Sequence, residues 1–175
     1  MSATTVKKRP SPSFVAQPLP PIYSKDSKVL ILGTMPSPKS REKGFYYGHS
    51  QNRFWSVLAR VFSCPVPAAK DERDRLILGN RLALFDVLRS CTISGASDHS
   101  ITDPVANDII PILENSSISY IATTGKKAYE LYMKYTFGKT GIEPIALPST
   151  SAQNFKFSFD DLAKEYSILK LLVGK

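Results

Sequence analysis

Apolar positions along the chain follow two different spacings. Unbroken apolar runs, such as the one that ends at Gly33, are typical of strands covered on both faces. Between these runs, apolar residues recur every three or four positions, as on a helix with one buried side. The runs predict strands at residues 28–32, 82–85, 118–122 and 142–147. The helical spacing predicts helices at residues 54–62, 68–80, 126–135 and 159–172, and one entered at Asp103-Pro104 that continues through Ile109, Ile110 and Leu113.

Strands that alternate with helices predict an α/β fold with a parallel sheet. We expect a single three-layer domain in which a central four-stranded parallel sheet carries helices on both faces. Sheets of this kind bind ligands beyond the carboxyl ends of their strands. The candidate site is therefore expected in the loops at residues 33–52, 86–98, 123–126 and 148–154.

The first 27 residues differ in character from the rest of the chain. Their prolines oppose regular helix or sheet, and a short basic run, Lys-Lys-Arg, occupies residues 7–9. The prolines are Pro10, Pro12, Pro18, Pro20 and Pro21. We predict a flexible, Pro-rich basic tail over residues 1–27 and one domain over residues 28–175. The basic run is consistent with a nuclear address, a weak phosphate contact or a solvated extension.

Composition narrows the class of protein. Lys and Arg number 23 against 15 Asp and Glu, and the resulting net charge of +8 over 175 residues favours a polyanionic partner. A hydrophobic content of 42% is enough for a packed core. Because no apolar stretch approaches the roughly 18 residues that span a bilayer, and no secretory signal is apparent, we expect no membrane association.

Residues suited to metal or redox chemistry are few. The chain has two cysteines, Cys64 and Cys91, and two histidines, His49 and His99. These are too few for a disulfide framework, a four-cysteine cluster or a multi-histidine centre, so we expect no metal and no cofactor. Both cysteines are predicted to be buried as small hydrophobic residues.

Two nucleotide-binding motifs are incomplete. Phe137-Gly138-Lys139-Thr140 resembles the end of a P-loop, but Met133 stands where the earlier glycine is required. A predicted strand, rather than a helix, follows Thr140. Gly33-Thr34-Met35-Pro36 lacks the later glycines of a dinucleotide-binding turn. A nucleotide-dependent oxidoreductase or transferase is therefore disfavoured.

The segment richest in functional groups is Gly44-Phe45-Tyr46-Tyr47-Gly48-His49-Ser50-Gln51-Asn52-Arg53-Phe54-Trp55. Aromatic rings in a glycine-flanked loop offer stacking faces for a planar base, and the polar side chains offer hydrogen bonds. A second segment, residues 147–154, follows the last predicted strand, and its hydroxyl groups suit phosphate oxygens.

Ordinary structural roles compete for the same residues. Asn52 is a favoured N-cap for the helix that follows it. Phe54 and Trp55 suit the hydrophobic core, and Tyr46 and Tyr47 suit surface cover. Composition and spacing leave both sets of roles open.

Three segments together resemble the uracil-DNA glycosylase superfamily. They are Gly33-Thr34-Met35-Pro36-Ser37, the segment from Gly44 to Trp55, and Leu147-Pro148-Ser149-Thr150-Ser151. Their order and spacing are most similar to the hypoxanthine-DNA glycosylase (DNA-deoxyinosine glycosylase) branch, from about residue 28 to the C-terminus. The resemblance implies the fold of that superfamily. It also implies a monofunctional base-excision repair enzyme that hydrolyses the N-glycosidic bond of deaminated bases, hypoxanthine first, with uracil and xanthine as further substrates.

The resemblance also implies roles for residues of the first two segments. Met35 occupies the position at which mismatch-specific relatives carry a water-positioning Asn, so that role passes to Asn52. Tyr47 matches the aromatic residue that stacks on the extruded base, and His49 is a candidate donor of a hydrogen bond. Gly33 and Met35 are expected to line the base pocket.

Further roles fall near the ends of later predicted strands. Asp86 aligns with the residue that reads the base edge, and a carboxylate accepts a hydrogen bond from N1–H of hypoxanthine. The loop that grips DNA corresponds to Ser149, Thr150, Ser151 and Ala152. Gly95-Ala96-Ser97-Asp98 matches a stretch of the same branch to which we assign no role.

Two other functions remain open: a mismatch-specific uracil/thymine glycosylase, which Met35 disfavours, and a DNA lesion-binding protein without catalysis. Lyase chemistry needs an activated lysine, and Lys126 and Lys127 are expected to be solvated residues at a helix start. We expect a monomer whose partner is DNA containing deaminated bases. Its expected location is the cytoplasm, associated with the nucleoid, in a bacterium or archaeon and the nucleus in a eukaryote.

Overall fold

A computed structural model describes residues 10–174, and its larger sheet has the strand order β3-β2-β6-β7. The strands are β2 (Val29–Gly33), β3 (Leu82–Asp86), β6 (Tyr120–Thr124) and β7 (Ile145–Leu147). Every neighbouring pair in this sheet is parallel. All residues of β2 and β3 are buried, which explains their unbroken apolar runs. The predicted four-stranded parallel sheet is confirmed.

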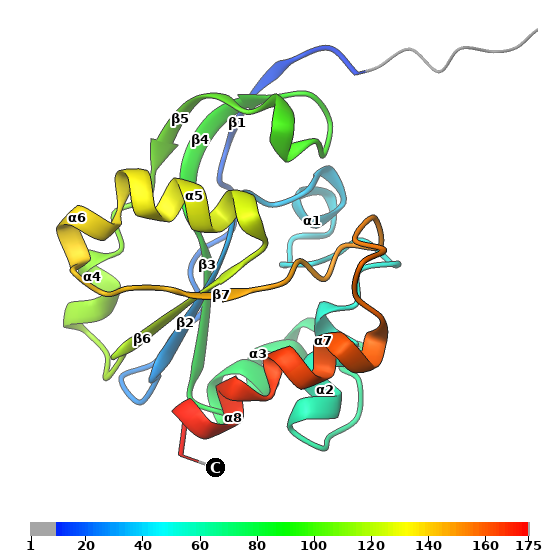
Figure 1. Ribbon diagram of the computed structural model, residues 1–175, viewed down its shortest axis with the longest axis vertical. Helices are drawn as coiled ribbons and strands as arrows, with labels where there is room; N and C mark the ends of the chain where they lie inside the picture. The colour runs from blue at the N-terminus through cyan, green and yellow to red at the C-terminus, as the bar shows by residue number, and fades with distance from the viewer. Residues whose placement is uncertain (1–9, 175) are drawn as a thin grey trace, which may run out of the picture.

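Helices cover both faces of this sheet (Figure 1). One side carries α4 (Ile110–Glu114), α5 (Lys126–Tyr135) and α6 (Phe137–Thr140). The other side carries α2 (Phe54–Val61), α3 (Lys70–Gly79), α7 (Phe159–Tyr166) and α8 (Ile168–Leu172). A short helix, α1 (Pro38–Lys43), lies within the long loop after β2. The predicted three-layer α/β architecture is therefore confirmed.

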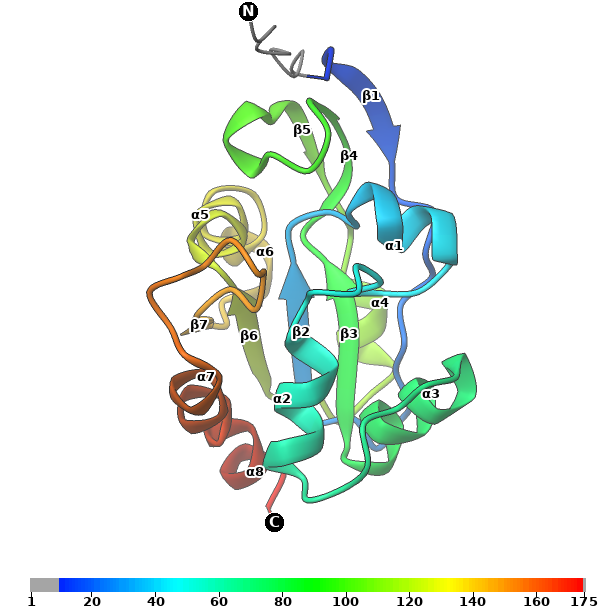
Figure 2. The ribbon, with the colours of Figure 1, turned by 90° about the vertical axis from the view of Figure 1, so that its right-hand side faces the viewer.

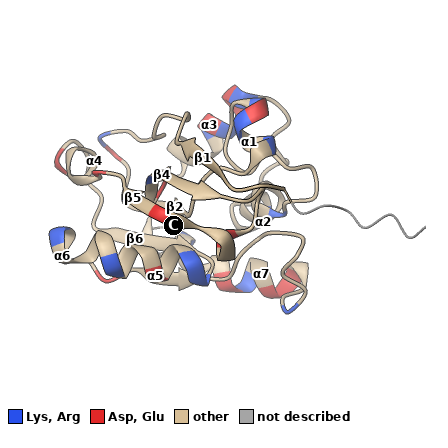
Figure 3. Ribbon diagram, turned by 90° about the horizontal axis from the view of Figure 1, so that it is seen from above, with Lys and Arg blue, Asp and Glu red and all other residues tan. Residues whose placement is uncertain are grey.

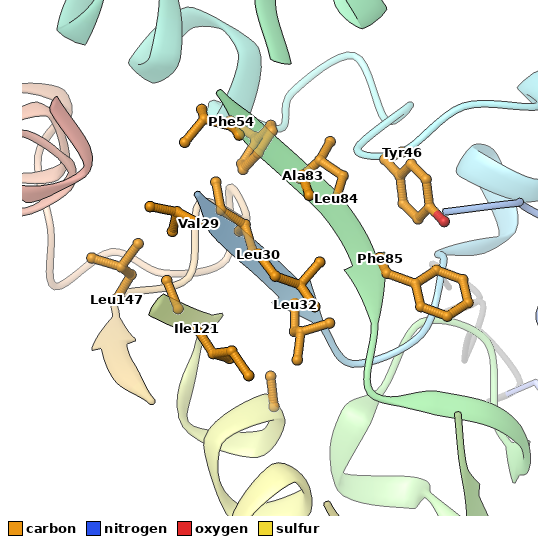
Figure 4. Close-up of a cluster of buried hydrophobic side chains, with 14 of the residues drawn as sticks. Val29, Leu30, Leu32, Tyr46, Phe54, Ala83, Leu84, Phe85, Ile121 and Leu147 are labelled. Carbon is orange, nitrogen blue, oxygen red and sulfur yellow. The ribbon is translucent and has the colours of Figure 1, made fainter. Parts of the chain in front are cut away.

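The hydrophobic core lies between the sheet and these helices. Figure 4 shows side chains of β2, β3 and β6 gathered with Phe54 of α2. Phe54 has no exposed surface and Trp55 is also buried, so their predicted place in the core is confirmed. Full burial of a large apolar side chain contributes about 1.5–3 kcal/mol relative to exposure.

A second, antiparallel sheet that the sequence did not predict lies beyond the end of β3 (Figure 2). It consists of β1 (Ser13–Ala16), β4 (Leu88–Ile93) and β5 (Thr102–Ala106), in the order β1-β4-β5. The predicted loop at residues 86–98 is thus largely a strand, which is only half buried and lacks a continuous apolar run. The helix expected from Asp103-Pro104 begins only at Ile110. Pro104 lies instead in the edge strand β5, where a missing N–H is tolerated.

The predicted flexible tail is wrong for the described residues 10–27. β1 pairs with β4 from Ser13 to Ala16, and Val15 and Leu19 are buried in the core. Ile22 exchanges two backbone hydrogen bonds with Leu84 of β3, at 2.9 and 2.8 Å. Pro10 and Pro12 precede β1, and Pro18, Pro20 and Pro21 lie between these contacts, so no proline falls at a position whose N–H is needed for pairing. The basic run at residues 7–9 lies outside the described residues.

Three smaller features complete the comparison with the sequence. The final helix divides in two at Ser167, giving α7 and α8. Cys91 is buried as predicted, whereas Cys64, which follows α2, is exposed. None of the helices formed by residues 10–174 combines the length and apolar character needed to cross a bilayer.

Candidate active site

A pocket opens at the carboxyl edge of the parallel sheet, and its cavity volume is about 120 Å³. Gly33 ends β2, Asp86 ends β3 and Thr124 ends β6, while Ser149 follows β7 by two residues; all four line the pocket. In the strand order β3-β2-β6-β7, the chain passes from β2 to β3 on one side of β2. The later strands β6 and β7 lie on the other side of β2. Such a switch point is where open α/β sheets bind ligands. The cavity is larger than the space that one water molecule needs.

The structure brings together most of the predicted base-pocket residues. Met35, Tyr47 and Asn52 enter the pocket from the long loop after β2. Together with Gly33, Asp86 and Ser149, they line one pocket, so the structure brings the three sequence motifs together.

Tyr47 is held in an unusual backbone conformation. Its φ of 54° lies in the left-handed region, which costs a non-glycine residue on the order of 1–3 kcal/mol. Its ring stacks on Phe54 with centroids 3.7 Å apart and planes 13° apart, and its hydroxyl lies 3.0 Å from Thr124 Oγ1. Burial raises the pKa of its phenol far above the usual value. These contacts fix one face and the tip of the ring, and they exclude surface cover as its role.

Asn52 is oriented by two donors. Its Oδ1 accepts from Phe54 N–H at 3.0 Å and from Thr150 Oγ1 at 2.8 Å. A backbone N–H only donates, so the amide oxygen must face Phe54, and both acceptor positions of that oxygen are taken. The amide nitrogen is the polar atom that remains for a ligand. Through its contact with Phe54 N–H, Asn52 also has a structural role at the start of α2.

Arg53 fastens the loop after β7 to the start of α2. Its Nη1 donates to the Phe157 carbonyl at 2.7 Å. Its Nη2 donates to the carbonyls of Ser151 and Asn154 at 2.8 and 3.0 Å. The Arg53 backbone N–H donates to the Thr150 carbonyl at 3.1 Å. A planar guanidinium with several fixed donors suits this clustering of carbonyl oxygens.

Asp86 is a buried carboxyl group at the base of the pocket. It is 4% exposed, and it stands opposite Gly33 in the register of β2 and β3. Its pKa is raised to about 7: burial has the largest effect and raises the pKa, a hydrogen bond from Gln17 lowers it, and the negative charge of Asp98 raises it. A Cβ atom at position 33 would collide with Asp86 Oδ1, so only glycine fits beside this carboxyl group.

Asp98 was not assigned a role from the sequence, although its Gly-Ala-Ser-Asp stretch was singled out. It begins the 3₁₀ helix η1 (Asp98–Ser100) and lines the pocket. Its Oδ2 accepts from Thr34 Oγ1 at 3.1 Å. Burial raises its pKa, which the Thr34 hydrogen bond and the charges of His99 and Lys127 lower. Lys127 is thus half-buried near the site rather than simply solvated.

Other predicted site residues lie beside the pocket rather than in it. His49 is exposed, and its Nδ1 accepts from Gln51 N–H at 3.2 Å, so it shapes the turn before α2. Thr150 is 1% exposed, and its hydroxyl faces Asn52 rather than the surface where DNA would lie. Ser151 and Ala152 are half-buried at the surface of the same loop. Lys126 is exposed, as expected.

Gln17, Arg53 and Thr124 are site residues for which the sequence analysis proposed no role. Thr124 lies at a strand end that was marked as a candidate loop, and Arg53 lies inside the aromatic segment. For both residues the sequence indicated a position near the site but not a function. Gln17 carried none, because its segment was assigned to a tail.

Comparisons with known proteins found related sequences. The model of the family described as the uracil DNA glycosylase superfamily matches residues 20–170. A hypoxanthine DNA glycosylase of Methanosarcina acetivorans is 30% identical over 147 residues, which are 83% of this chain and 92% of that protein. A protein of the same name from Methanosarcina barkeri is 28% identical over 79% of this chain and 87% of its own length.

A similar fold has been solved. The solution NMR structure of a Methanosarcina acetivorans protein, provisionally described as a uracil DNA glycosylase, matches with a TM-score of 0.78. The match has 27% sequence identity and covers 91% of this chain and 99% of that one.

Proposed function

This chain belongs to the uracil DNA glycosylase superfamily, and on that premise we propose that it is a monofunctional DNA glycosylase that releases deaminated bases, hypoxanthine foremost. The observation that supports this most directly is the convergence of Tyr47, Asn52 and Asp86 on one pocket at the carboxyl edge of the sheet. The two relatives named hypoxanthine DNA glycosylase favour hypoxanthine as the base.

Binding begins with rotation of the damaged nucleotide out of the duplex, which costs a few kcal/mol and less for a poorly paired base. Stacking on Tyr47 returns about 1–3 kcal/mol of this. The ring of Tyr47 is already fixed by Phe54 and Thr124, so little further ordering is required. Asp86 accepts a hydrogen bond from the ring N–H of the base.

Bond cleavage builds positive charge on the sugar and negative charge on the departing base. In this proposal the amide nitrogen of Asn52 donates to the attacking water and holds it beside the sugar. Asp98, in the same pocket, offers acceptor oxygens for the hydrogens of that water. Met35 lines the pocket as an apolar wall and takes no part in proton transfer.

The loop after β7 suits contact with DNA beside the lesion. Phe155 in this loop is 91% exposed, and Lys156 next to it is also exposed. An apolar wedge stabilises a distorted duplex, and a neighbouring lysine attracts phosphate. His49, exposed on the loop before α2, is assigned to the DNA-facing rim rather than to the base.

The test is a set of end-labelled duplexes, each with one hypoxanthine, uracil or xanthine, incubated with the protein in EDTA. We expect strand cleavage only after alkali treatment, strongest at hypoxanthine. Stronger cleavage at uracil would instead assign a mismatch-specific uracil activity. Cleavage without alkali would contradict the monofunctional mechanism, and tight binding without any cleavage would identify a lesion-binding protein.

A further inference from the structure

Gln17, in the N-terminal segment, contacts the pocket residue Asp86. It follows β1 directly, and its backbone N–H donates to the Arg89 carbonyl of β4 at 2.7 Å. Its side-chain Nε2 donates to Asp86 Oδ2, while its Oε1 accepts from Leu19 N–H at 2.9 Å. Because the Leu19 N–H only donates, the oxygen of the amide must face Leu19. The nitrogen of the amide therefore faces Asp86.

The backbone on both sides of Gln17 is fixed. Before it, β1 pairs with β4. After it, the Tyr46 hydroxyl lies 3.2 Å from the carbonyl oxygen of Leu19 and 3.0 Å from that of Pro20, and donates toward both. Leu19 itself is buried. The Gln17 amide is thus held in place before any ligand arrives, as a preorganised site requires.

The two oxygens of Asp86 have different surroundings. Oδ2 accepts from Gln17. Oδ1 lies over Gly33, close to where the Tyr47 hydroxyl also lies, and both of these residues line the pocket. Within residues 10–174, no hydrogen-bond donor reaches Oδ1. Because Asp86 lines the pocket, a carboxylate oxygen of this residue without a donor suits a donor supplied by the ligand.

We propose, on the basis of the glycosylase function above, that Gln17 is a positioning residue: by occupying Oδ2 it keeps Oδ1 of Asp86 as the acceptor for a ring N–H of the extruded base. Hypoxanthine carries this N–H at N1 and uracil at N3. Adenine and cytosine, from which these bases arise by deamination, have an unprotonated ring nitrogen at the same place. A carboxylate oxygen facing that nitrogen would oppose two acceptors, so Gln17 favours deaminated bases over their parents.

The Gln17 contact also acts on the protonation of Asp86. Burial and the charge of Asp98 raise the pKa of Asp86, whose value is about 7, and the hydrogen bond from Gln17 lowers it. The other titratable groups that face Asp86 are Tyr46 and Tyr47. Burial raises both of their pKa values, so they stay neutral near pH 7. Loss of the Gln17 donor therefore raises the pKa of Asp86 and lowers the fraction of its acceptor form at neutral pH.

The test uses the full chain with Gln17→Leu and Gln17→Glu. The first removes the donor, and the second keeps the shape of the side chain but places a second carboxylate beside Asp86. Carboxyl ¹³C NMR, assigned with Asp86→Asn, is expected to show the Asp86 titration moving to higher pH in both variants. A rise of one unit from 7 lowers the ionised fraction at pH 7 from about one half to about one tenth.

Single-turnover release of hypoxanthine should fall about fivefold at pH 7 for such a shift and recover by pH 9. Release of adenine from a matched duplex should not fall in parallel. Ser13→Ala, at an exposed position of β1, is the control and should leave both readouts unchanged. Thermal melting of all variants tests whether the fold is retained.

The outcomes separate this inference from the proposed function. An Asp86 titration that is the same in Gln17→Leu, Gln17→Glu and the parent overturns the role of Gln17, whatever the activity. A pH-independent loss of release in a folded variant overturns it as well. A shifted titration in a protein that releases no base supports the contact and instead contradicts the glycosylase function.

Discussion

At the scale of single residues, the pocket contains polar side chains in which one polar atom is already hydrogen-bonded within the protein. Asn52 uses its amide oxygen on Phe54 N–H and Thr150, and Asp86 uses Oδ2 on Gln17. Each therefore presents one remaining atom of known character: a donor nitrogen and an acceptor oxygen, respectively. Such prior commitment reduces the reorganisation needed when charge develops during bond cleavage.

Asn52→Ala removes the group that we assign to the attacking water. Since deleting one preorganised donor typically costs a factor of about 100–1000 in rate, single-turnover release of hypoxanthine should fall by that amount. Binding to the same duplex, measured by fluorescence anisotropy, should change little. Asn115→Ala, at the exposed end of α4, is the matched control. Unchanged release in Asn52→Ala would end the assignment of Asn52.

Asp86 links stability to pH in a direction that follows from its raised pKa of about 7. A carboxyl group whose pKa is raised by folding stabilises the fold at low pH, and this stabilisation is lost as pH rises through the folded value. Asp86→Asn removes that loss. Its melting temperature relative to the parent should therefore be higher at pH 8 than at pH 5. An equal difference at both pH values would show that Asp86 ionises normally in the fold.

At the scale of elements, Arg53 joins the start of α2 to the loop after β7 through carbonyl oxygens of that loop. Arg53→Lys keeps the charge but not the planar set of donors, so it should release the loop nearly as much as Arg53→Ala does. Trypsin cleavage after the exposed Lys156 measures this release and should be faster in both variants. Arg60→Lys, on an exposed position of α2, should cleave at the parental rate. A parental cleavage rate in Arg53→Lys would indicate that charge alone matters.

β1 has one buried face and one exposed face, so substitutions on the two faces should differ in their effect on stability. Val15 is 9% exposed and packs in the core, whereas the neighbouring Phe14 is 72% exposed. Val15→Asp buries an unpaired charge and should lower the free energy of unfolding by about 3 kcal/mol or more. Phe14→Asp should change it by less than about 0.5 kcal/mol. Urea denaturation measures both, and equal effects would show that the segment is not packed as described.

At the scale of the whole molecule, charge is spread over several helices. Figure 3 shows basic and acidic bands alternating along α5 and α7, and the net charge of +8 over the chain is the sum of such mixed surfaces. Net positive charge gives affinity for DNA that does not depend on sequence. The local geometry of the pocket then selects the base.

Affinity for an undamaged duplex should therefore fall with salt. A log–log slope between about −3 and −6 corresponds to about three to seven neutralised phosphates. Lys156→Ala should make this slope less negative by about one, because Lys156 lies in the loop assigned to DNA. Lys139→Ala on α6 is the control, since α5 separates α6 from the carboxyl edge of the sheet. A slope near zero would contradict phosphate contact.

The local pattern of the sequence was sufficient for the parallel sheet and for most of the base pocket. The apolar runs at β2 and β3 reflect burial on both faces, so these short unbroken runs indicate strands without any knowledge of the partner strands. The topology of such a sheet brings its strand ends together. The sequence therefore predicts that Asp86 and the loop residues Tyr47 and Asn52 lie at the same edge, and all three line the pocket.

Other parts of the site depended on contacts between distant segments. The pairing of β1 with β4 gives residues 13–16 their structure, although their short, mostly exposed stretch has no strong period of its own. Gln17 and Asp86 are 69 positions apart in the sequence, and no local feature of either segment predicts their contact. Thr150, expected to face DNA, turns inward because the Asn52 oxygen lies beside it. The sequence alone thus determined the sheet and the groups at its edge, whereas tertiary packing decided which atom of each group is left for the substrate.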